Sequence, residues 1–165
     1  MTLQTRSQAP ITADDLAYLA RIARLDRKAF FDRHPCYRVL ADRVICVALC
    51  QGAALHFLDG RNGAKDFDVW TFYAAHPDAT YPPRRLMSRL FGDTRPSEPL
   101  DRPEFAGRRI DLLGRSLNAD VDAEPVTTLR HYLSEGPTRS ACELARKAVI
   151  LIEPASRLGT VVWPR

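Results

Sequence analysis

The chain has 165 residues, of which 45% are hydrophobic and 27% charged, a balance typical of one soluble globular domain. Its net charge of +4 permits an anionic ligand but is too small to indicate nucleic-acid binding by itself. The sequence contains neither an N-terminal signal pattern nor an apolar run of membrane-spanning length. We therefore expect a cytoplasmic protein without membrane association, with residues 1–10 disordered and one domain over residues 11–165.

The first half of the chain alternates between helix and strand patterns. Thr12 and Asp15 form an N-cap pair that opens a helix, and His34-Pro35 ends it. The run 43–50 is apolar and β-branched, which suits a buried strand, although a helix also fits. The expected elements are a helix at 13–32, a short helix at 37–42, a strand at 43–50, a short helix at 53–58 ended by Asp59-Gly60, and a half-buried strand at 66–73.

The second half predicts fewer strands. Prolines and glycines indicate a turn-rich connection at 76–83 and a loop at 92–107, which as a loop is a place for ligand contacts. Thr138 or Ser140 would cap the last helix. The expected elements are helices at 84–91, 127–133 and 139–152, a strand at 108–113, and a short edge strand at 160–163. Together these patterns predict an α/β or α+β domain with a mixed sheet and flanking helices.

Three acidic residues lie within apolar strand patterns. Asp66 and Asp68 are two residues apart, so on a strand their side chains point to the same face. Two like charges held together are costly unless a cation lies between them, and Mg²⁺ or Mn²⁺ prefers such oxygen ligands. Asp111 lies on the next expected strand. If the two strands are neighbours, the three carboxylates converge and form a candidate metal site.

A glycine turn precedes the acidic pair. Gln51-Gly52-Ala53 lies where a strand should lead into a helix, and backbone N–H groups at such a helix start bind phosphate well. Glycine also allows a ligand to approach the backbone closely. Lys147, on the expected late helix, would add a point charge for a triphosphate or would simply be solvated. The combination predicts a nucleoside triphosphate as ligand.

These features together resemble the DNA polymerase β-like nucleotidyltransferase superfamily, and most of all its minimal members. The resemblance covers residues 44–113 and rests on the Gly52-Ala53 turn, a spacer of twelve residues, Asp66-Phe67-Asp68-Val69 and Asp111. It implies that Asp66 and Asp68 bind the catalytic metals and that Asp111 completes the site and helps to activate the acceptor. It further implies that a nucleoside monophosphate moves to a hydroxyl group and that pyrophosphate is released.

The chain departs from this pattern at one position. The family usually has a serine after the glycine, and Ala53 has no hydroxyl for a phosphate, although Gln51 could replace that donor from the other side of Gly52. The departure leaves two classes of function open. One is a nucleotidyltransferase acting on a small molecule, an RNA or a protein. The other is a non-catalytic protein of this fold, either an antitoxin-like partner of another protein or a nucleotide-binding regulator.

Other polar residues have simpler interpretations. Cys46 and Cys50 could share a strand face near His56 and hold zinc, but cysteines within an apolar run are usually buried and reduced. Arg109 lies on the same face as Asp111 and would either pair with it or bind phosphate. A basic helical face, most simply solvated, is formed by Arg84, Arg85 and Arg89.

Overall fold

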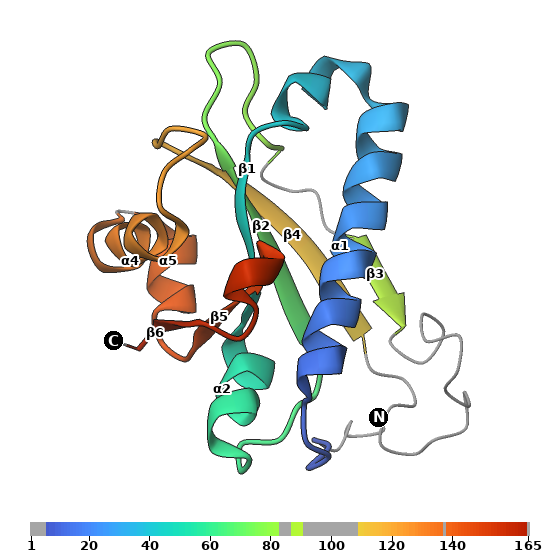
Figure 1. The fold of residues 1–165 in the computed structure, drawn as a ribbon, viewed down its shortest axis with the longest axis vertical. Helices are drawn as coiled ribbons and strands as arrows, with labels where there is room; N and C mark the ends of the chain where they lie inside the picture. The colour runs from blue at the N-terminus through green and yellow to red at the C-terminus, as the bar shows by residue number, and fades with distance from the viewer. Residues whose placement is uncertain (1–5, 83–86, 91–108, 137, 165) are drawn as a thin grey trace.

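A six-stranded mixed sheet forms the centre of the structure, a computed structural model that describes residues 6–82, 87–90, 109–136 and 138–164 (Figure 1). The strand order is β3-β4-β2-β1-β5-β6. The strands are β1 (Val44–Cys50), β2 (Phe67–Ala74), β3 (Met87–Leu90), β4 (Arg109–Leu117), β5 (Val149–Glu153) and β6 (Val161–Trp163). The α-helices are α1 (Ala13–Arg33), α2 (Gln51–Asp59), α4 (Pro125–Glu135) and α5 (Arg139–Leu144), and short 3₁₀ helices occupy Pro35–Leu40 and Ala155–Arg157.

The helices cover both faces of the sheet, which confirms the predicted α/β domain with a mixed sheet. Along β1 the side chains alternate, so Val47 and Leu49 pack with α1 and α2 on one face. Cys46, Ala48 and Cys50 belong to the core on the other face, under α4 and α5. Strands β2 and β4 are parallel, whereas the other pairs are antiparallel. Because β2 and β4 run in the same direction, the residues at the N-terminal end of β2 lie beside those at the N-terminal end of β4.

Several predicted elements are confirmed. Thr12 accepts a hydrogen bond from the Asp15 N–H at 3.2 Å, and the Asp15 carboxylate accepts one from the Thr12 N–H at 2.9 Å, which is a complete capping box for α1. Gly60 ends α2 with a φ of 63°, a left-handed conformation that favours glycine. The strand expected at 108–113 is present and continues to Leu117.

Two predicted helices are wrong. Within the expected helix 84–91, the described residues Met87–Leu90 form β3, which pairs antiparallel with the edge of β4. A free strand edge offers backbone hydrogen bonds that outweigh a weak local preference for helix. Arg89 therefore lies on a strand, whereas Arg84, Arg85 and the loop predicted at 92–107 lie outside the described residues.

The helix expected at 139–152 ends at Leu144, and β5 begins at Val149. Strand β5 lies between β1 and β6 and is buried on both faces, so its sequence shows no alternation that would separate strand from helix. Thr138 caps α5 by accepting a hydrogen bond from the Ala141 N–H at 3.2 Å. Lys147 consequently lies in the turn between α5 and β5, not on a helix.

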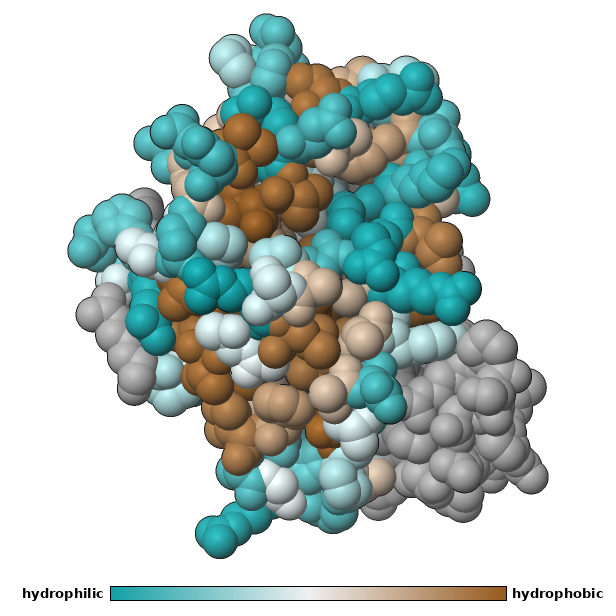
Figure 2. All heavy atoms as spheres, in the orientation of Figure 1, coloured by the Kyte–Doolittle hydropathy of each residue, from teal (hydrophilic) through white to brown (hydrophobic). Residues whose placement is uncertain are grey.

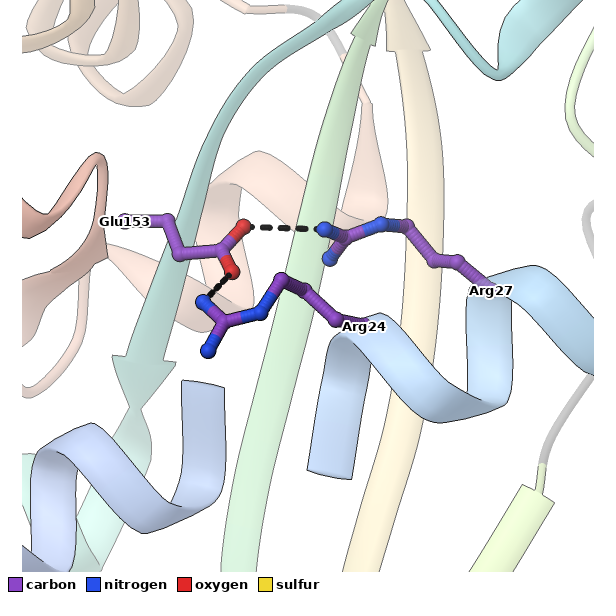
Figure 3. Close-up of polar contacts among 3 residues, drawn as sticks. All are labelled: Arg24, Arg27 and Glu153. Atoms are coloured by element: carbon purple, nitrogen blue, oxygen red, sulfur yellow. Dashed lines mark hydrogen bonds and ion pairs between the residues drawn. The ribbon is translucent and has the colours of Figure 1, made fainter. Parts of the chain in front are cut away.

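An ion-pair group fastens α1 to the end of β5 (Figure 3). Glu153 accepts hydrogen bonds from Arg24 at 2.5 Å and from Arg27 at 3.0 Å. The Arg27 and Glu153 side chains are 15% and 11% exposed, whereas that of Arg24 is 55% exposed. The Arg27–Glu153 pair is thus the shielded part of the group and contributes more to stability than the exposed one.

The N-terminal segment is held against the loop after α2. Ser7 pairs with Ala64, and the Arg6 guanidinium donates to both the backbone oxygen and the side-chain oxygen of Asn62, each at 3.1 Å. His56 is buried and links the same parts, since its Nδ1 accepts from the Gly63 N–H and its Nε2 donates to the Ala9 carbonyl. Residues 6–10, expected to be disordered, are therefore anchored.

The outer surface over α2 is partly apolar. Figure 2 shows hydrophobic residues gathered over this helix, beside a more hydrophilic surface along α1. Leu58 is 40% exposed, and Leu55, Phe57 and Leu158 are only partly buried against the core. A limited apolar surface of this kind is common on soluble domains.

Candidate functional site

The predicted acids meet at the start of β2. Asp68 and Asp111 are direct partners in the parallel β2–β4 pair, so their Cα atoms face each other across the strands. Asp66 immediately precedes β2. The Asp111 side chain is nearly buried, at 8% exposure, and that of Asp66 is 31% exposed. The register therefore brings residues 43 positions apart into contact range, as the sequence pattern predicted.

Arg109 holds Asp111 in a two-pronged ion pair. Its Nε lies 2.7 Å from Oδ1 of Asp111, and its terminal nitrogen donates to Oδ2 at 2.9 Å. The same guanidinium lies 4.0 Å from Asp66. The hydrogen bond to Asp111 raises the pKa of Arg109 above its usual value. Of the two roles open for Arg109, pairing with Asp111 is the one that the structure shows.

Asp68 is the electrostatically costly member of the group. Burial, and after it the nearby charges of Asp66 and Asp111, raise the pKa of Asp68 to about 6 against the opposing effect of Arg109 and Lys147. The carboxylate is therefore ionised at neutral pH in surroundings that favour its neutral form. A cation placed beside Asp68 would lower its pKa and recover that free energy.

The start of α2 lies beside these acids. No side chain caps this helix, because Cys50 at the N-cap position makes no such hydrogen bond. The first N–H groups of a helix have no partner within it; in α2 that of Gln51 donates to the Ala148 carbonyl, so those of the following residues are the ones to offer an anion. A Cβ at Gly52 would lie 3.3 Å from the Asn62 amide nitrogen and 3.8 Å from the Lys147 amine. Glycine thus keeps the approach to this backbone open, next to a positive charge.

The two neighbours of Gly52 have different roles. Gln51 has a φ of 61°, donates its N–H to the Ala148 carbonyl and donates its side-chain amide to the Glu143 carbonyl. It therefore joins the start of α2 to the α5–β5 turn, in a conformation that few residues other than glycine adopt. Ala53 is buried, at 1% exposure, and its side chain belongs to the core cluster that includes Leu49 and Phe67. Its contribution to phosphate binding could come only from its backbone N–H.

A cavity of about 440 Å³ opens between these elements, and we call it the Gly52 cavity. Its volume lies within the range of about 300–1,000 Å³ typical of small-ligand pockets. Four cationic side chains meet three carboxylates there. The lining residues are Arg6, Gln51, Gly52, Gly63, Lys65, Asp66, Asp68, Glu143, Arg146 and Lys147.

The structure adds residues that the sequence pattern did not reveal. Arg6, Lys65, Arg146 and Glu143 line the Gly52 cavity although none belongs to the motif. Asn62 donates to the carbonyl groups of Gly52 and Gly63, at 3.0 and 2.9 Å, and so shapes the loop over the helix start. These residues come from separate segments, and their spacing in the chain contains no signal that they meet.

Neither candidate metal site forms a closed set of ligands. Among the described residues, no three or more His, Cys, Asp or Glu side chains lie close enough together to hold a metal ion. For the acids, the Arg109 fork occupies Asp111. For the cysteines, burial raises the pKa of Cys46 to about 12 and raises that of Cys50 strongly, and His56 is engaged by Ala9 and Gly63. All four cysteines are free thiols.

Comparison with known proteins adds no information on the function of this site. Searches against protein-family models, curated proteins and solved structures found no match to the chain. Within the part of the chain that the structure describes, no helix has the length and apolar character needed to cross a membrane.

Proposed function

We propose that the protein is a metal-dependent nucleotidyltransferase that binds a nucleoside triphosphate in the Gly52 cavity. One observation carries the proposal: Asp68 lines a cavity that begins at a helix N-terminus, and Asp111 is in register with Asp68 on the neighbouring parallel strand. Paired carboxylates and backbone N–H groups are the two kinds of ligand that a metal-bound triphosphate requires. This supports a nucleotidyltransferase-like fold for the β1–α2–β2–β4 unit.

The charges of the Gly52 cavity suit a triphosphate. Lys147 lies closest to Gly52, and Arg146, Lys65 and Arg6 surround the same space. An anion bound there gains from these cations and from the dipole of α2. Glu143 and the acids provide the opposite charge, so the cavity favours an anion that arrives with a divalent cation.

The chemical type of the donors also suits the metal, although the three carboxylates of the described residues would have to move closer together to hold it. Carboxylate oxygens of Asp68, Asp111 and Asp66 match the preference of Mg²⁺ or Mn²⁺, which when bound would neutralise charge on the phosphates. Arg109 must first release Asp111, since its fork occupies both carboxylate oxygens. Asp111 is then placed to accept the proton of an acceptor hydroxyl. The hydroxyl oxygen bonds to the α-phosphorus, the bond from that phosphorus to the β-phosphate oxygen breaks, and pyrophosphate leaves.

A nucleotide-binding regulator, or an antitoxin-like partner of another protein, is the second candidate. The observation that favours it is the same Arg109–Asp111 fork, which neutralises one of the acids without any metal. Such a protein would bind the triphosphate through Gly52 and Lys147 but would not transfer it.

The test is a calorimetric titration of the four nucleoside triphosphates with Mg²⁺, with Mn²⁺ and without metal. Asp68→Asn should abolish the metal-dependent part of binding, and Lys147→Met should weaken triphosphate binding about tenfold. The matched controls are Asp122→Asn and Lys28→Met, because Asp122 is exposed and the Lys28 side chain is 76% exposed. Metal-independent binding unaffected by either site substitution would disprove the assignment. Pyrophosphate release with candidate acceptors then separates an enzyme from a regulator.

A further inference from the structure

A second cavity lies beside the acids on the same face of the sheet. It has a volume of about 150 Å³ and is lined in part by Trp70, Leu113, Arg115 and Ser140, and we call it the Trp70 cavity. Whole small ligands occupy pockets of about 300–1,000 Å³, so this space suits one ring or one head group. The residues that line it are not needed for the triphosphate site proposed above.

The two cavities are adjacent, because the same elements contribute to both. On β2, Asp68 lines the Gly52 cavity and Trp70 lines the Trp70 cavity. Residues two apart on a strand share a face and lie about 7 Å apart. On α5, Glu143 and Ser140 face the two cavities in the same order, one helical turn apart. A ligand on Trp70 would therefore lie within one small-molecule length of Asp68.

Trp70 offers a flat surface. Its ring stacks against Phe72 at a centroid distance of 6.1 Å and an interplanar angle of 18°, and the residue is only partly buried. Phe72 is fully buried in the core and packs against the indole. A supported, partly exposed indole is a good platform for a nucleobase, since every base has a π-face to stack on it.

Arg115 offers a positive charge next to this platform. Its strand neighbour across β2 is Phe72, and Leu113 is the neighbour of Trp70, so Arg115 is one step further along β4 on the same face. The guanidinium donates to the Ser140 hydroxyl at 3.2 Å and lies 5.9 Å from the centre of the Tyr132 ring. No carboxylate of the described residues lies within ion-pairing distance of it. Arg115 is thus oriented by neutral groups and keeps donors for an anion.

We infer that the acceptor is a nucleotide unit and that the Trp70 cavity holds only its base, stacked on Trp70, with the phosphate on Arg115 at the cavity wall and the sugar hydroxyl outside the cavity, directed to Asp68 and Asp111. The inference rests on the proposed function, because it identifies the acceptor of that reaction. The unit is either a free nucleotide or the end of a single-stranded RNA, since both present the same three groups. Transfer would join the nucleoside monophosphate to its hydroxyl and release pyrophosphate.

The experiment uses adenosine 5′-monophosphate and a six-residue single-stranded RNA as probes, titrated calorimetrically without triphosphate. Trp70→Ala should weaken binding about 5- to 150-fold, and Arg115→Gln about tenfold. Trp70→Phe should keep most of the affinity while losing the quenching of tryptophan fluorescence that we expect when a probe binds to the wild-type protein. Trp163→Phe is the matched control, because Trp163 is the second tryptophan and its indole is bonded to the Ala145 carbonyl.

The outcomes separate the sources and the sites. If both probes bind, a free nucleotide is enough to serve as the acceptor. If only the RNA binds, the acceptor is the end of an RNA strand. If neither probe binds, or if binding falls with Lys147→Met but not with Trp70→Ala, the inference is overturned. The proposed function is tested separately: it is refuted if the wild-type protein shows no metal-dependent triphosphate binding. Trp70→Ala should leave that triphosphate binding unchanged. Near-ultraviolet circular dichroism of Trp70→Phe and Arg115→Gln confirms that these two variants are folded.

Discussion

Replacing Asp68 by asparagine should stabilise the protein at neutral pH in the absence of metal. The pKa of Asp68 rises from 3.8 to about 6 on folding. The folded state then binds more protons than the unfolded state between these values, so the free energy of unfolding falls as the pH rises through this interval. A rise of this size corresponds to about 3 kcal/mol at full ionisation. Because the side chain is only partly buried, we expect Asp68→Asn to gain about 1–3 kcal/mol above pH 7.

The assay is urea unfolding followed by tryptophan fluorescence, with a chelator present, at about pH 4 and at pH 7.5. The difference between Asp68→Asn and the wild type should be large at the higher pH and close to zero at the lower one, where Asp68 is protonated. Asp122→Asn, which changes an exposed carboxylate, should show no such dependence. If Asp68→Asn is less stable than the wild type at pH 7.5, or equally shifted at both pH values, the electrostatic reasoning is wrong.

Three further predictions follow from the same contacts. Arg109→Gln should tighten Mn²⁺ binding about tenfold, because the Asp111 carboxylate loses the fork that occupies it; weaker binding in a manganese titration would show that Arg109 supports the ligand rather than competing with it. Gly52→Ala should change the urea midpoint little, since alanine suits a helix, yet reduce triphosphate affinity; unchanged affinity would exclude close backbone approach. Arg27→Met should lower the free energy of unfolding by about 1–3 kcal/mol, because its ion pair with Glu153 is shielded from water. Arg24→Ala should lower it by less than about 1 kcal/mol, because Arg24 is exposed; equal losses in urea unfolding would contradict this difference.

The site was easier to predict from the sequence than the sheet around it. Asp66, Asp68 and Gly52 are close in the chain, and a helix start and the beginning of β2 place them locally, although Asp66 lies one residue before the strand on which it was expected. Asp111 required the assumption that its strand neighbours β2, which the parallel register confirms.

The elements that the sequence did not predict depend on distant partners. Met87–Leu90 becomes a strand because the edge of β4 is there to pair with it. Residues 149–153 form a strand because β1 and β6 enclose them on both sides. The same limit applies to Arg6, Lys65 and Arg146, since a single sequence contains no local signal that these cations surround one cavity. Pairing with Asp111 was one of the two roles predicted for Arg109, because both residues lie on one strand face.

The link made by Gln51 also has a consequence for the order of events during synthesis. Its side chain bonds to Glu143, 92 positions later in the chain, and its N–H bonds to Ala148. The start of α2 is therefore joined to the Lys147 turn by hydrogen bonds that need residues 143–148, which directly precede β5. Contacts of such long sequence separation form late, because a large loop must close first. A nascent chain that has emerged only through β4 would carry all three acids but would not yet hold the turn that completes the Gly52 cavity.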